Sequence, residues 1–108
     1  MIERQSSTPF FRTLQCTHPA HDAPWEVVVT IHLPEKDPLP GGDYRVLLQI
    51  AGAGEPYSHY VHGADALHAF LECCWLVSEI LPSLVPAGSQ LTWEGREDLG
   101  FWKRSEDR

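Results

Sequence analysis

The chain has 108 residues, of which 43% are hydrophobic and 21% charged, and eight Lys and Arg against fifteen Asp and Glu give a formal net charge of −7. This length allows one domain with a hydrophobic core and excludes two, and the composition excludes a disordered chain. The negative charge disfavours nucleic acid and anionic membranes as partners, because both would repel the protein at long range. It leaves a basic protein partner open, and it also simply keeps a small protein soluble.

The N-terminus and the cysteines indicate where the protein resides. Residues 1–8 contain no apolar run that could act as a signal sequence, and no segment reaches the roughly 18 apolar residues of a membrane span. The chain has three cysteines, Cys16, Cys73 and Cys74. An odd number with two adjacent members does not resemble the cysteine pattern of a disulfide-bonded protein. We therefore expect a cytoplasmic protein without a membrane partner.

Four segments predict strands, namely residues 10–16, 25–33, 43–51 and 57–62. The second is the clearest, because one of its faces carries Trp25, Val27, Val29, Ile31 and Leu33. The third likewise places one set inward, consisting of Tyr44, Val46, Leu48 and Ile50. Such alternation is typical of an antiparallel sheet covered on one side. Residues 34–42 hold three prolines and two glycines and predict a long connection.

Residues 63–84 predict the one main helix. Asp65 lies in its first turn, where a carboxylate meets unpaired backbone amides, and Pro82 limits how far it extends. We expect its core face to be a stripe at three- and four-residue spacing that comprises Leu67, Phe70, Leu71, Cys74, Val77, Ser78 and Leu81. Strands followed by a helix predict a single α+β domain, with an antiparallel sheet of about four strands and the helix packed on one face. A further short strand is expected within residues 91–94, and residues 1–8 and 103–108 are expected to be loosely ordered.

The helix also carries a second apolar face. About 180° from the stripe lie Ala69, Cys73, Leu76 and Ile80, and the polar wedge between the two faces contains Trp75. Either the C-terminal segment covers this face or another chain does, as a second subunit or a partner. The five residues are therefore candidates for an interface.

The histidines raise the possibility of a metal site. The potential ligands are Cys16, His18, His21, His59 and His62. Against this, residues three apart in a strand point to opposite faces, and the paired Cys-x-x-Cys half-sites of structural zinc are absent. We expect no bound metal and no other cofactor.

No catalytic motif stands out. Cys73 and Cys74 lie midway along the helix, away from the dipole that would activate a thiolate, and His68 with Glu72 is the spacing of a surface ion pair. Glu94, Glu97 and Asp98 predict a solvated acidic loop rather than an acid–base pair in a pocket. We therefore expect a protein without enzymatic activity.

Several short segments of the C-terminal half resemble a family. They are Gly63-Ala64-Asp65-Ala66-Leu67-His68-Ala69, then Leu91-Thr92-Trp93-Glu94-Gly95 and Asp98-Leu99-Gly100-Phe101. The chain resembles a family of small uncharacterised bacterial proteins that has a Gly-x-Asp-x-Leu helix start, a Leu-x-Trp segment and a Leu-Gly-Phe segment. Ala64 stands for the usual Val and His68 for the usual Gln. The resemblance implies a bacterial source and a fold, and no activity. On physical grounds, Gly95 and Gly100 predict turns that fold Trp93 and Phe101 back onto the helix.

Two hypotheses follow for the function. The first is a small acidic, non-catalytic interaction protein, such as an immunity or accessory factor that binds a protein partner or a second copy of itself. The alternative is a metal-binding protein that uses the cysteine and histidine groups named above.

Overall fold

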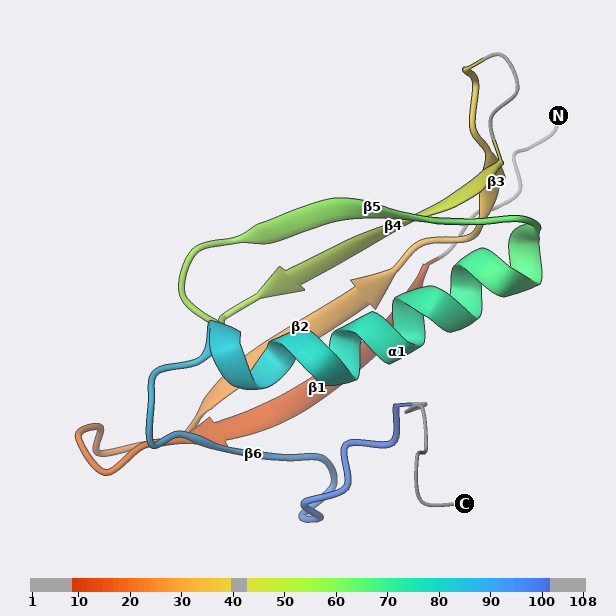
Figure 1. Ribbon diagram of the computed structural model, residues 1–108. Helices are drawn as coiled ribbons and strands as arrows, with labels where there is room; N and C mark the ends of the chain where they lie inside the picture. The colour runs from red at the N-terminus through yellow and green to blue at the C-terminus, as the bar shows by residue number, and fades with distance from the viewer. Residues whose placement is uncertain (1–8, 40–42, 102–108) are drawn as a thin grey trace, which may run out of the picture.

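The computed structural model describes residues 9–39 and 43–101, and it contains one helix packed on one face of a six-stranded antiparallel sheet (Figure 1). The elements in chain order are β1 Phe10–Thr17, β2 Trp25–Ile31, β3 Glu35–Lys36, β4 Tyr44–Ala51, β5 Tyr57–Gly63, α1 Ala66–Leu84 and β6 Gln90–Thr92. The predicted α+β class is confirmed, although the sheet has more strands than the four expected. The loosely ordered ends predicted for residues 1–8 and 103–108 lie outside the described residues.

The two extra strands are short. β3 lies within the segment that we expected to be a connection only, and it pairs Glu35 with Arg45 on β4. It spans two residues because Pro34 and Pro38 flank it, and proline has no N–H to donate to a ladder. β6 falls where a last short strand was expected, and it pairs with the end of β1.

The strands lie side by side in the order β5, β4, β2, β1, β6. Arg45 on β4 pairs with His62 of β5 on one edge and with Glu35 of β3 on the other, so β3 continues the line of β2. The chain thus runs as a meander from β1 to β5. It then passes through α1 and returns as β6 at the far edge, beside β1 (Figure 1).

The inward faces of the strands agree with the alternation in the sequence. The side chains of β2 and β4 that were expected to face the helix are buried or pack against the buried core: Trp25, Val27, Val29, Ile31, Tyr44, Val46, Leu48 and Ile50. Each fully buried one contributes on the order of 1.5–3 kcal/mol, which fixes the register. Leu33 is the exception, since it follows the end of β2 and is 39% exposed.

The orientation of the helix differs from the prediction. The residues of α1 buried against the sheet are Ala69, Cys73, Val77 and Leu81. Val77 and Leu81 belong to the expected stripe, but Leu67 and Leu71 are 65% and 37% exposed. Ala69 and Cys73, predicted to form part of an interface, are fully buried and cannot contact a partner. Small side chains at these two positions let the helix lie close to the sheet.

The start of α1 is fixed by its cap and by one glycine. The side chain of Asp65 accepts a hydrogen bond from His68 N at 2.7 Å, and His68 Nδ1 accepts one from Ala64 N at 2.8 Å. A Cβ at Gly63 would lie 2.3 Å from Ala69 N, so only glycine lets the helix fold back onto the end of β5. The helix ends two residues beyond Pro82.

The apolar character of α1 extends around most of its surface. By length and composition alone its 19 residues, with a mean hydropathy of 1.3, could cross a membrane, contrary to the expectation that no segment would reach this limit. Core helices have the same composition, and α1 packs one face on the sheet.

The orientation of α1 can be tested with two leucines that the sequence pattern places together. Leu81→Ala should lower the free energy of unfolding by about 2–5 kcal/mol, because Leu81 is fully buried and the change leaves a cavity. Leu67→Ala, the matched control on the same helix, should change it by less than about 1 kcal/mol. Urea unfolding measures both. Equal losses would mean that the helix is rotated toward the stripe expected from the sequence.

Candidate functional site

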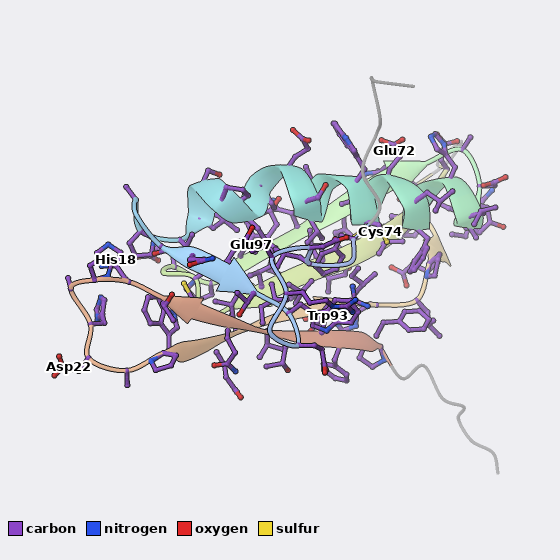
Figure 2. All side chains as sticks on the ribbon, turned by 90° about the horizontal axis from the view of Figure 1, so that it is seen from below. His18, Asp22, Glu72, Cys74, Trp93 and Glu97 are labelled. Atoms are coloured by element: carbon purple, nitrogen blue, oxygen red, sulfur yellow. The ribbon has the colours of Figure 1, made fainter. Side chains whose placement is uncertain are left out.

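The segment after β6 covers the part of the sheet that α1 leaves open. Figure 2 shows the segment that carries Trp93 and Glu97 on the same side of the sheet as α1. Its apolar side chains pack against the core, and they are Leu91, Trp93, Leu99 and Phe101. Trp93 and Arg96 exchange backbone hydrogen bonds of 2.8 and 2.9 Å around a tight turn, with positive φ at Glu94 and Gly95. The predicted turn at Gly95 is confirmed.

Arg12 fastens this segment to β1. Arg12 pairs with Val29 and therefore points to the helix side of the sheet. Its guanidinium carbon lies 3.9 Å from the ring centre of Trp93 and 4.9 Å from that of Phe101, and its Nη1 donates to Leu99 O at 3.1 Å. We call these contacts the Arg12 clasp. Cation–π contacts of this kind contribute roughly 0.5–2 kcal/mol each.

Gly100 allows the clasp to close. Its φ is 78°, in the left-handed region, which confirms the predicted turn. A Cβ there would lie 2.5 Å from the Trp93 ring and 2.8 Å from Arg12 Nη1. A larger residue would push the ring and the guanidinium apart.

A hollow of about 270 Å³, the β1 hollow, opens beside the clasp. Its walls come from the start of β1, from β2, from α1 and from the last described residues. They are Phe10, Phe11, Arg12, Val29, Ile31, Phe70, Cys74, Gly100 and Phe101. Arg12 is the one charged side chain among these lining residues, and Figure 2 shows Cys74 on the side of α1 that faces the segment with Trp93.

A second hollow of about 280 Å³ lies on the other side of Phe10 and Phe70, whose rings meet edge to face with centres 5.6 Å apart. Only apolar side chains line it: Phe10, Leu33, Pro34, Ala66, Leu67 and Phe70. Leu71 lies one turn beyond Leu67 on α1. We call Phe10, Leu33, Leu67, Phe70 and Leu71 the apolar end patch. Phe10 is 52% exposed, so the patch is open to solvent.

The remaining interface candidates of α1 are half-buried. Leu76 and Ile80 pack against the core. Trp75 lies on the side of the helix that faces away from the sheet, where it has an interaction partner of its own. Their role in an interface stays a prediction. The sequence pattern predicts that Leu67 and Leu71 face the core, and this prediction is wrong because both are exposed.

The proposed metal ligands are not brought together. Cys16 is fully buried in the core. Both ring nitrogens of His18 are engaged: Nε2 donates to Ala87 O at 2.9 Å, and Nδ1 accepts from Ala20 N at 3.0 Å. The centre of the His21 ring lies 5.5 Å from that of His18. His59 and His62 point to opposite faces of β5. Within residues 9–39 and 43–101, no three His, Cys, Asp or Glu side chains are close enough to hold a metal ion.

His62, His68 and Asp98 each make a structural contact. His62 Nε2 lies 3.1 Å from Asp37 Oδ2. The hydrogen bond that Asp37 accepts from Leu39 N lowers the pKa of Asp37; burial opposes this shift, and the hydrogen bond with His62 adds to it. This pair ties the loop after β3 to β5. His68 Nε2 is 3.6 Å from Glu72, and Asp98 accepts from Gly100 N at 2.9 Å within its own turn.

The two adjacent thiols are not activated. Burial, and secondarily the neighbouring Cys74, raises the pKa of Cys73 from 9.0 to about 12. Burial also raises the pKa of Cys74, and Arg12 partly opposes that shift. Both remain protonated near neutral pH, so neither is a ready nucleophile or redox centre.

Thiol reactivity checks this assignment. At about pH 8, a disulfide reagent such as Ellman's reagent should react slowly with one thiol of the native protein, the half-buried Cys74, and with all three thiols in urea. Cys74→Ser should abolish the native reaction. Rapid modification of two or more thiols in the folded protein would contradict the burial of Cys16 and Cys73.

The raised pKa of Cys73 also predicts a pH dependence of stability. The unfolded thiol ionises near pH 9.0 and the folded one near 12, so unfolding releases a proton between these values. The free energy of unfolding should be unaffected by this group below about pH 8 and should fall as pH rises above about 9. Urea unfolding at stepped pH measures the effect, and Cys73→Ala should reduce the slope. An unchanged slope would mean that another group causes it.

Comparison with known proteins identifies a family model that matches most of the chain. The model of a protein family described as a domain of unknown function (DUF6968) matches residues 10–103. No curated protein and no solved structure matches. The expected likeness to an uncharacterised family is thus confirmed, whereas the bacterial source stays a prediction.

Proposed function

The chain belongs to the DUF6968 family of domains of unknown function, and we propose that it is a non-catalytic protein-binding domain that docks its partner on the apolar end patch. The observation that carries this proposal is the exposure of large apolar side chains from three separate elements at one end of the fold. Solvated apolar surface of this kind is costly, and on soluble domains it marks interaction sites.

The shape of the patch favours an apolar side chain of the partner as the anchor. The second hollow is entirely apolar, Leu67 lines its helical side, and Leu71 lies one turn farther along α1, so the two leucines form a ridge on the helix that begins at the hollow. Buried aromatic or aliphatic anchors of this type supply most of the energy of protein interfaces. The net charge of −7 favours basic residues around the anchor, because opposite charge speeds association.

An immunity or accessory factor is the more specific role that we propose. Such a protein acts by occupying the surface of one cognate partner, and it needs no catalytic group of its own. The protonated thiols and the structurally engaged histidines support a role without catalysis.

Selection from a random peptide library displayed on phage tests the proposal. We expect the full chain to enrich peptides with aromatic or aliphatic anchors and nearby Lys or Arg. The selected peptides are then synthesised. The double variant Leu67→Glu and Leu71→Glu should bind them at least tenfold more weakly than the parent, a loss of about 1.4 kcal/mol, because it places charge on the ridge.

The matched control is Leu39→Glu. Leu39 is 67% exposed, close to the 65% of Leu67, but it lines neither hollow. This variant should bind the peptides as the parent does. Failure to enrich any peptide, or equal weakening by both variants, would contradict docking on the apolar end patch.

A further inference from the structure

We propose that the β1 hollow binds a small molecule with an apolar body and a single carboxylate, and that Arg12 receives the carboxylate. This goes beyond the protein-binding role, and the residues that test it differ from the Leu67–Leu71 ridge. The ligand class is a medium-chain or aryl-substituted monocarboxylic acid.

The charge of Arg12 is the first argument. It is partly buried, yet no carboxylate of residues 9–39 or 43–101 lies within 4 Å of its guanidinium. The rings of Trp93 and Phe101 and the carbonyl of Leu99 offset part of the cost of burying this cation, and a paired anion would offset more of it. A carboxylate entering the β1 hollow would supply that anion.

The geometry of the guanidinium is the second argument. Trp93 and Phe101 lie against it, and one N–H is bonded to Leu99 O, so its position is fixed before any ligand arrives. A guanidinium carries five N–H groups, and within the described chain Leu99 O engages only one of its nitrogens. The remaining donors form the planar fork that matches a carboxylate.

The walls of the hollow define the rest of the ligand. Apart from Arg12 and the Cys74 thiol, they consist of aromatic rings, aliphatic side chains and Gly100. The volume of about 270 Å³ is slightly below that of pockets for drug-sized ligands, so it suits a body on the order of ten non-hydrogen atoms. A single arginine among apolar walls disfavours phosphates and other multiply charged anions, because their desolvation would not be offset.

Calorimetric titration of the full chain tests the proposal with two matched pairs of compounds, octanoate against octanamide and 3-phenylpropionate against 3-phenylpropanamide. The carboxylates should bind with one site per chain and submillimolar affinity, and the amides at least tenfold more weakly. The Arg12→Gln variant should bind the carboxylates at least tenfold more weakly than the parent does. Arg96→Gln is the matched control, because Arg96 lies 5.2 Å from the same Trp93 ring and does not line the hollow.

A second variant keeps the test decisive if Arg12→Gln unfolds. Cys74→Met fills the hollow from α1 and leaves the Arg12 clasp in place, so it should abolish binding of carboxylates and amides alike. The proposal is overturned if amides bind as tightly as carboxylates, if Cys74→Met binds as the parent does, or if neither class binds at millimolar concentration.

Discussion

One helix is too narrow to cover one face of this sheet. An α-helix is about 10 Å across, whereas five strands at about 4.8 Å spacing span roughly 20 Å. α1 starts directly after the end of β5. Its last residue, Leu84, lies next to Gly54 in the turn that precedes β5, since a Cβ at Gly54 would be 3.5 Å from Leu84 O. The helix therefore runs back along β5. The inward side chains of β1 therefore depend on the segment after β6, and the Arg12 clasp holds that segment in place.

The incomplete cover also explains where function is expected. At the start of β1 and the end of β2, α1 and the last described residues contribute walls but do not fill the space between them, so both hollows form there. The Phe10 and Phe70 rings separate an entirely apolar hollow from one with a single cation. One end of the fold thus offers two adjacent surfaces of different chemistry. Two further hollows lie farther along the helix side, between the end of α1 and the segment after β6, and carboxylates line part of their walls.

The strands could be predicted from the sequence because a two-residue period allows only one inward set in β2 and β4. The orientation of α1 could not, because apolar residues surround most of the helix and periodicity does not choose among its faces. Small side chains at Ala69 and Cys73 decided it. Arg12 shares its face of β1 with the buried Leu14 and Cys16, a signal that an inward arginine needs partners. Its contact with Leu99 spans 87 residues, and no local pattern predicts such a pairing.

The same long-range contact determines when the domain can finish folding. β1 is the first described strand to leave the ribosome, whereas β6 and the segment that carries Trp93 and Phe101 follow all the other described elements. Loops of this length close slowly compared with the hairpins between neighbouring strands. A nascent chain that has already formed β1 to β5 and α1 still exposes the inward side of β1. Completion of the core is thereby coupled to synthesis of residues 90–101, and until then the inward side of β1 is exposed to aggregation.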